Sequence, residues 1–122
     1  MREIKFRAWG STITNNRKHI FTPAVDGFNC LNVGIDNLQA IGIVIMQYTG
    51  LKDKNEASQR EVYEHDILYD GKGKYYKVEW DYRNTGWRGI NTYNNNKKNL
   101  VELLLAGSIV VGNIYENQEL LR

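Results

Sequence analysis

Cysteine, histidine and proline are scarce in this sequence, and their scarcity excludes several kinds of protein. One of the 122 residues is a cysteine, so the chain can form no intramolecular disulfide. We expect Cys30 to be a small buried hydrophobic side chain in a reducing compartment. Two histidines without His-Glu-x-x-His or Cys-x-x-Cys spacing predict no zinc site, and we expect no cofactor. A Cys30 nucleophile paired with His19 or His65 stays open, although no catalytic motif surrounds Cys30.

Long apolar runs and a strong net charge are also missing. Apolar runs such as residues 43–46 stop far short of the roughly 18 residues that a membrane-spanning helix needs. The segment after Met1 lacks the apolar stretch of a secretory signal, so we predict a cytoplasmic protein with no membrane partner. The net charge of +2 is too small to imply a partner by itself.

Alternating apolar and polar residues predict a mainly β protein. Residues 3–9 alternate, and residues 19–22 are expected to pair back onto them, up to the single proline, Pro23. Residues 24–37 have the composition of a loop. Residues 41–46 have the pattern of a largely buried strand that ends at Thr49-Gly50, and residues 52–61 that of an exposed loop.

The second half of the chain predicts a hairpin and further strands. Strands at 67–69 and 74–80 flank a turn that begins with Asp70-Gly71, a strong hairpin signal. Residues 87–93 can form a third strand and residues 109–115 a final one.

One helix is predicted, at residues 97–106. Leu100, Leu103 and Leu104 would share one face of it, with Asn96 as N-cap and Gly107 as C-cap. Residues 117–121 are expected to form one helical turn.

Several segments combine aromatic, acidic and turn-forming residues in a fixed order. They are Arg7-Ala8-Trp9, residues 47–54 (QYTGLKDK), residues 63–67 (YEHDI), Val78-Glu79-Trp80 and residues 112–121 (GNIYENQELL). In this order they resemble the YopX family of proteins encoded by phages and prophages. The sequence departs from the family pattern at His65, where a glycine is usual, at the extra residues 57–60, and at Gln118, where a proline is usual. These departures bear on turn geometry.

The resemblance implies a mainly β fold: an SH3-like β-barrel or roll with additional short strands and one short helix near the C-terminus. It implies a single domain over residues 1–122, with a barrel-forming part at roughly 46–122 and N-terminal β elements at 1–45. It also implies that the protein is located in the cytoplasm of a bacterial host cell, and that no biochemical activity has been assigned to the family. A strand from Ile67, a hairpin and a second strand ending in Trp80 are the ingredients of such a barrel.

The central signature has two interpretations. In one, Gly50 supplies a positive φ and Asp66 accepts backbone N–H groups, so the signature specifies turns and register. In the other, Tyr48, Tyr63, Glu64 and Asp66 converge at a rim that recognises a host or phage protein or a second copy of the chain. We predict no catalytic residues and no enzyme, because Glu64 and Asp66 lie in a polar stretch that we expect to be wet, and such a stretch does not raise a carboxyl pKa as acid–base catalysis requires. The predicted function is binding to a protein partner or to a second copy of the chain, and binding of single-stranded nucleic acid is the alternative.

Basic and aromatic residues gather between positions 70 and 98. Seven Lys and Arg against three Asp and Glu give this stretch a local charge of +4. The cations can neutralise phosphates while tyrosine and tryptophan stack on bases. The alternative is that the aromatic residues fill the core and the lysines solubilise the outer face. The candidate nucleic-acid face comprises Lys72, Lys74, Tyr75, Lys77, Tyr82, Arg83, Trp87 and Arg88, with Lys97 and Lys98 as further phosphate contacts.

Overall fold

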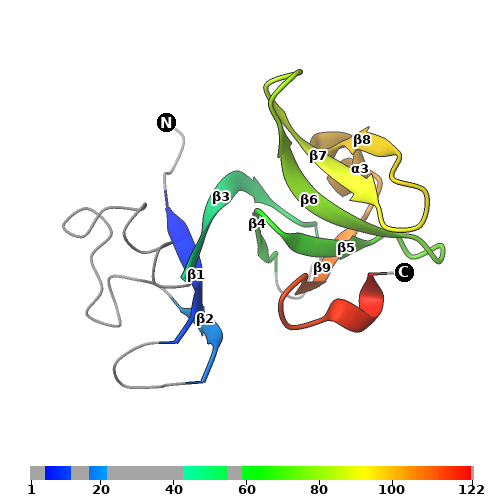
Figure 1. Cartoon of the computed structure of the whole chain (residues 1–122). Coiled ribbons are helices and arrows are strands. Elements are labelled where there is room, and N and C mark those ends of the chain that lie inside the picture. Colours follow the sequence, from blue (N-terminus) through cyan, green and yellow to red (C-terminus); the bar gives the residue numbers. More distant parts are fainter. Residues whose placement is uncertain (1–4, 12–16, 22–42, 55–58, 122) are drawn as a thin grey trace. The chain divides into compact units, whose positions relative to one another are not determined.

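The computed structural model describes residues 5–11, 17–21, 43–54 and 59–121, and the chain divides into two compact units after Tyr48 (Figure 1). Strands dominate the described residues, so the mainly β fold class is confirmed. The loop predicted at residues 24–37 and the expectation for Cys30 lie outside the described residues. Within the described ranges, no helix has both the length and the apolar content that a membrane crossing requires.

The first unit contains an antiparallel arrangement of three strands. β1 (Phe6–Gly10) pairs with β2 (His19–Phe21) on one side and with the first part of β3 (Val44–Lys52) on the other. Ala8 lies opposite both Phe21 and Ile45, which places this small buried residue in the middle of the three strands. The predicted pairing of the two N-terminal strands is confirmed.

The predicted end of the third strand at Thr49-Gly50 is wrong. Gly50 has the expected positive φ of 86°, yet β3 continues to Lys52 in the second unit, where β4 (Glu61–Tyr63) is its neighbour. The Thr49 hydroxyl donates a 2.7 Å hydrogen bond to the Val62 carbonyl, so the pairing with β4 keeps the backbone extended past the glycine.

A curled five-stranded antiparallel sheet forms most of the second unit (Figure 1). The hairpin predicted at Asp70-Gly71 is confirmed: the Asp70 carboxylate accepts the backbone N–H groups of Lys72 and Lys74.

The assignment of an SH3-like barrel and the assignment of a single domain stay predictions. The sheet order is β8-β7-β6-β5-β9, with β5 (Asp66–Tyr69), β6 (Tyr75–Asp81), β7 (Gly86–Asn91), β8 (Lys97–Asn99) and β9 (Ile109–Asn113).

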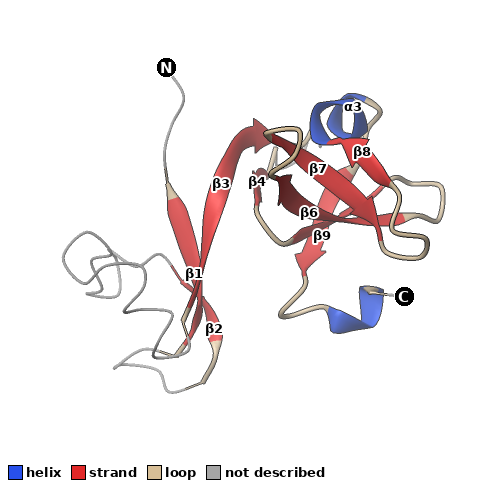
Figure 2. Cartoon of the chain, turned by 45° about the horizontal axis from the view of Figure 1, so that its top comes forward, coloured by secondary structure: helices blue, strands red, loops and turns tan. Residues whose placement is uncertain are grey.

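The helix is shorter than predicted because its first residues pair as a strand. Lys97–Asn99 form β8 against β7, and α3 (Leu100–Leu105) begins only after them (Figure 2). The N-cap is therefore Asn99, whose side chain accepts the N–H groups of Val101 and Glu102, and not Asn96. The C-cap is Ala106 and not the predicted Gly107, which is the next residue and adopts the left-handed φ of 101° that commonly ends a helix. The C-terminal helical turn is confirmed as η1 (Gln118–Leu120).

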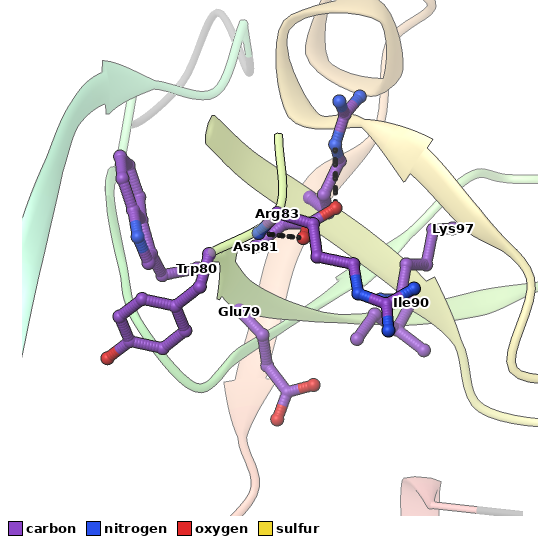
Figure 3. Close-up of a pocket in the computed structure, with 8 residues that line it drawn as sticks. Glu79, Trp80, Asp81, Arg83, Ile90 and Lys97 are labelled. Atoms are coloured by element: carbon purple, nitrogen blue, oxygen red, sulfur yellow. Dashed lines mark hydrogen bonds and ion pairs between the residues drawn. The ribbon is translucent and has the colours of Figure 1, made fainter. Parts of the chain in front are cut away.

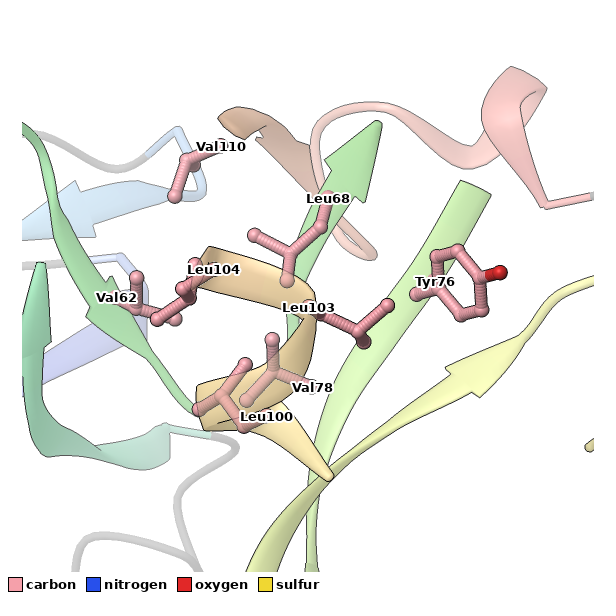
Figure 4. Close-up of a cluster of buried hydrophobic side chains, with 8 residues drawn as sticks. All are labelled: Val62, Leu68, Tyr76, Val78, Leu100, Leu103, Leu104 and Val110. Atoms are coloured by element: carbon pink, nitrogen blue, oxygen red, sulfur yellow. The ribbon is translucent and has the colours of Figure 1, made fainter. Parts of the chain in front are cut away.

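The core of the second unit lies between α3 and the concave side of the sheet (Figure 4). The predicted helix face is confirmed, because its three leucines are buried against side chains from four strands. Gly89 of β7 makes this packing possible, since a β-carbon there would overlap Leu103. The cluster consists of Val62, Leu68, Tyr76, Val78, Leu100, Leu103, Leu104 and Val110.

Asp53 ties three segments of the second unit together, although it lies in the stretch predicted to be an exposed loop. Its side chain is 2% exposed. One carboxylate oxygen accepts the Arg60 N–H at 2.9 Å and the other accepts the Val110 N–H of β9 at 3.0 Å. The Arg60 guanidinium donates to the Val110 carbonyl at 3.2 Å. β9 is an edge strand, with β5 on one side only. Asp53 and Arg60 provide hydrogen-bond partners for the backbone N–H and carbonyl of Val110, so they cover part of this exposed edge.

We expect Asp53→Ala to lower the free energy of unfolding by about 2–5 kcal/mol, because two hydrogen bonds to a buried charged acceptor are lost. Asp53→Asn keeps one acceptor oxygen and should lose about half as much. Lys54→Ala, at the exposed neighbouring position, should change stability by less than about 0.5 kcal/mol. Urea unfolding followed by tryptophan fluorescence measures all three. Equal midpoints for the Asp53→Ala and Lys54→Ala proteins would contradict the role of Asp53.

Candidate functional site

The turn between β4 and β5 is built by the central signature itself. His65 adopts φ 71°, a left-handed conformation that glycine takes easily, so the turn geometry suits the glycine that the resemblance implies at this position. Its backbone N–H donates to Val78, and its carbonyl accepts from Ile114. The Asp66 carboxylate accepts the Tyr63 N–H at 2.7 Å. The interpretation of this segment as a turn and register signal therefore has direct geometric support.

The four residues of the predicted recognition rim differ in exposure. Tyr48 is 5% exposed and Asp66 is 1% exposed, whereas Tyr63 and Glu64 are half-buried. Tyr48 belongs to the first unit, where the Lys5 ammonium lies 4.9 Å from the centre of its ring, and the other three belong to the second unit. Buried side chains offer little surface to a partner, so the geometry favours another surface.

The C-terminal signature also builds a turn. The Asn113 side-chain oxygen accepts the backbone N–H groups of Tyr115 and Glu116, and the backbone N–H of Asn113 donates to the Asn117 side chain at 3.1 Å. Gly112 is required because a β-carbon there would overlap the Asn117 side chain. These hydrogen bonds thus hold the chain in place after β9.

Strand alternation divides the basic aromatic stretch between two sides of the sheet. Tyr76 and Val78 of β6 point into the core, so Tyr75, Lys77 and Glu79 point away from it. The residues paired with them share their side. We call this surface the outer face; its members are Tyr75, Lys77 and Glu79 on β6, Arg88 and Ile90 on β7, and Lys97 on β8.

Trp87 is not part of the outer face. It lies opposite Trp80, with ring centroids 5.2 Å apart in an edge-to-face arrangement, and it packs against the core cluster. Trp87 follows the alternative interpretation, in which an aromatic residue fills the core. The Lys98 ammonium also lies on the core side, 5.7 Å from the centre of the Tyr76 ring.

A hollow of about 320 Å³ lies at the end of the outer face beside the β6–β7 turn (Figure 3). Tyr82 at its margin is 85% exposed, and Arg83 is also exposed. We call it the Tyr82 hollow. Its lining residues are Glu79, Trp80, Asp81, Tyr82, Arg83, Arg88, Ile90 and Lys97.

Asp81 organises the Tyr82 hollow. Its carboxylate accepts hydrogen bonds from the Asn84 side chain at 2.9 Å and from the Arg83 N–H at 3.0 Å, and it faces the Arg88 guanidinium at 3.6 Å. The Asn84 hydrogen bond, together with the Arg83 N–H and the charge of Lys97, lowers the pKa of Asp81 although desolvation opposes this. Asp81 is therefore ionised at neutral pH, and it holds the turn while Arg83, Arg88 and Lys97 supply positive charge.

The structure brings together only part of the predicted nucleic-acid face. Tyr82, Arg83 and Arg88 meet in the Tyr82 hollow, and Lys77 lies on the outer face. Lys72 and Lys74 are exposed in the β5–β6 loop, and Tyr75 packs against Tyr69 with ring centroids 4.8 Å apart. In the part of the chain that the structure describes, no three His, Cys, Asp or Glu side chains gather to hold a metal ion.

The prediction from the sequence differs from the structure at Lys97 and omits the exposed Tyr93. Lys97 was placed on a helix, but β8 sets it opposite Ile90 and in the Tyr82 hollow. Tyr93, which was not among the candidates, is 87% exposed in the β7–β8 turn. Its position just before three asparagines was an available sign that it lies in a turn and not inside a strand.

We expect Gly112→Ala to destabilise the fold by about 1–3 kcal/mol, because the added methyl group displaces Asn117 from the Asn113 N–H. Gly86→Ala is the matched control, since its β-carbon would meet only the Asn84 carbonyl at an ordinary 3.7 Å. Thermal unfolding followed by circular dichroism compares the two. If both proteins melt at the wild-type temperature, the C-terminal signature does not depend on this close approach.

Comparison with known proteins assigns the chain to a family. No curated protein matches the sequence. The model of one protein family, described as YopX protein, matches residues 5–122. The match covers nearly the whole chain, including the turn-building segments described above. The chain therefore belongs to the YopX family.

Proposed function

We propose that this protein acts by binding and not by catalysis, and that it binds single-stranded nucleic acid through the outer face and the Tyr82 hollow. The observation that carries the proposal is Tyr82, a large aromatic side chain that is 85% exposed beside three cations. Exposed aromatic rings next to a positively charged groove are the usual means of holding single strands without regard to sequence.

The Tyr82 hollow supplies both parts of such an interaction. Stacking of one base on an aromatic ring contributes about 1–3 kcal/mol. Arg83, Arg88 and Lys97 line the same hollow, and we assign to them the phosphates on either side of the stacked base. Asp81 fixes the β6–β7 turn through two hydrogen bonds, so less conformational entropy is lost when a ligand binds there.

Acidic residues reduce the positive charge of this surface without removing it. Lys77, Arg83, Arg88 and Lys97 stand against Glu79 and Asp81, so four positive charges against two negative charges leave +2. Affinity should therefore be moderate and strongly dependent on salt.

The cellular setting is part of the proposal. Membership of the YopX family is consistent with an accessory protein and assigns no activity. Together with the resemblance to phage and prophage proteins, it supports a role in the cytoplasm of a bacterial host cell.

The test is a titration of the protein into labelled single-stranded DNA, duplex DNA and RNA at 50 and 200 mM salt, followed by fluorescence anisotropy. We expect single strands to bind at low salt and to be released at high salt. Tyr82→Ala should weaken binding about 5- to 100-fold, because a stacking ring is lost. Tyr82→Phe keeps the ring and should bind as the wild type does.

A comparison of Lys97→Ala with Lys54→Ala shows whether binding depends on a contact in the Tyr82 hollow or only on the net charge of the protein. Each removes one positive charge, but only Lys97 lies in the Tyr82 hollow. We expect Lys97→Ala to weaken binding and to make the logarithm of the affinity less steep against salt by about 0.7 for one phosphate contact. Absence of binding by any strand at 50 mM salt would reject nucleic acid as the ligand.

A second candidate is association with a protein, either a second copy of the chain or a host or phage protein. Val101 and Leu105 of α3 favour it: they are 45% and 62% exposed and lie four residues apart, on the same side of the helix. The rim of Tyr48, Tyr63, Glu64 and Asp66 is the weaker location, because two of its side chains are buried.

Sedimentation velocity over a range of protein concentrations tests self-association. If α3 forms the contact, Leu105→Asp should shift the protein to the monomer, because it places a charge in an apolar interface. The association should change little with salt, unlike the binding of a nucleic acid. If the wild-type protein stays monomeric at every concentration, self-association is wrong, and the second candidate is reduced to association with a different protein.

A further inference from the structure

We propose that the nucleic-acid strand is held at two points, at the Tyr82 hollow and at a second aromatic site formed by Tyr93, so that it runs along β6 and β7. The inference rests on the proposed function and adds to it a site length and a second set of contact residues. It begins from Tyr93, which is 87% exposed, as fully as Tyr82.

Tyr93 stands at a second hollow, of about 270 Å³, between the β5–β6 and β7–β8 loops. The backbone of Tyr93 is held in place by the Asn91 side chain, whose oxygen accepts the backbone N–H groups of Tyr93 and Asn94. The Thr92 N–H donates to the Tyr75 carbonyl at 3.0 Å, which joins the two loops. An exposed ring on a braced turn is the arrangement that Tyr82 also has. We call this the Tyr93 hollow; Lys74 and Tyr75 line it as well.

The two hollows are connected along one side of the sheet. Tyr75 lines the Tyr93 hollow and Glu79 lines the Tyr82 hollow, and both point outward from β6 with Lys77 between them. Residues at even spacing on a strand share a face, so the outer face is continuous from one hollow to the other. A ligand that crosses it meets Lys77 and Arg88 before reaching the second ring.

The length of β6 determines how many nucleotides of a single-stranded nucleic acid can lie between the two tyrosines. The pairs Tyr76↔Asn91 and Asp81↔Gly86 lie at opposite ends of the hairpin. They are five residues apart, which is roughly 17 Å at about 3.4 Å per residue, and the turns that carry the two rings extend this to about 20 Å. At the helical rise of about 3.4 Å per nucleotide, the span holds about six nucleotides, and an extended strand reaches across with fewer. One binding event should therefore occupy about four to six nucleotides, within the range known for small barrels.

Two separated aromatic contacts predict an affinity that depends on length. A dinucleotide can reach one ring only. A strand long enough to span β6 gains the second contact without a second association step, because the first contact raises its local concentration. Affinity should therefore rise sharply up to about six nucleotides and little beyond.

The test measures affinities of deoxythymidine oligomers of two, four, six and twelve nucleotides at 50 mM salt, with the wild type, Tyr82→Ala, Tyr93→Ala and Tyr93→Phe. We expect Tyr93→Ala to weaken the six- and twelve-nucleotide complexes about 5- to 100-fold and to leave the dinucleotide less affected. Tyr93→Phe keeps the aromatic ring and should bind with the wild-type affinity. Amide chemical shifts of Gly73 and Thr92, which line the Tyr93 hollow, should move with six nucleotides in the wild-type protein.

The outcomes separate this inference from the function on which it rests. If the wild type binds and Tyr82→Ala weakens every complex while Tyr93→Ala weakens none, the proposed function holds and the second contact is wrong. If affinity is the same for two and twelve nucleotides, the two-point arrangement is also overturned. If no oligomer binds the wild-type protein, both proposals fail together.

Discussion

Burial of the three α3 leucines against β6 and β7 decides which side of the sheet is free. Leu100, Leu103 and Leu104 occupy the concave side together with Tyr76 and Val78. Strand side chains alternate, so this one contact commits the intervening residues of β6 to the opposite side. Gly89 is part of the same constraint, since any larger residue would push Leu103 away. The candidate binding surface is thus a consequence of how the core is closed.

Short polar side chains then fix the turns around this core. Asp66 and Asp70 each accept backbone N–H groups at the start or end of β5, and Asp81 does so after β6. Asn91 and Asn113 act in the same way after β7 and β9. A buried or half-buried acceptor with two satisfied donors defines one turn geometry, because any other leaves those donors without a partner.

The segments that carry the resemblance to the YopX family are mostly these turn-building segments. Gly112 and Asn113 illustrate this: their contacts go to Asn117 and to the backbone that follows, with no role that faces outward. A pattern of this kind identifies a fold, but it does not identify an activity. The two tyrosines on which the proposed function rests, Tyr82 and Tyr93, lie outside these segments and are 85% and 87% exposed.

Local chemistry made some of the structure predictable. The hairpin at Asp70-Gly71 and the apolar face of α3 depend on residues close together in the sequence, so pattern and turn propensity suffice. β8 was not predictable, because Lys97 has a good helix propensity and becomes a strand residue only through pairing with Ile90. β3 continues past Gly50 for the same reason, since its neighbour β4 is formed by residues outside the local pattern.

The candidate site shows the same limit. Charge and aromatic content located the stretch between positions 70 and 98, but only the register of β6 and β7 shows that Trp87 faces inward and Arg88 outward. Burial of Asp53 was equally hidden, because its partner Val110 is 57 residues away. Contacts at such separations depend on the tertiary fold and leave no periodicity in the sequence.

The contact between Arg88 and Asp81 determines how the surface can respond to a phosphate. The two groups are 3.6 Å apart through a single nitrogen, a geometry that contributes little compared with a bidentate pair. Asp81 is held in place by Arg83 and Asn84, whereas Arg88 retains 24% of its side-chain exposure. Under the proposed function, Arg88 could exchange the Asp81 carboxylate for a phosphate without breaking the two hydrogen bonds that hold the β6–β7 turn. The charge of Asp81 would then lower the affinity for a nucleic acid, while its hydrogen bonds would keep the turn that carries Tyr82 rigid. Weak binding without regard to sequence is what such an arrangement would give.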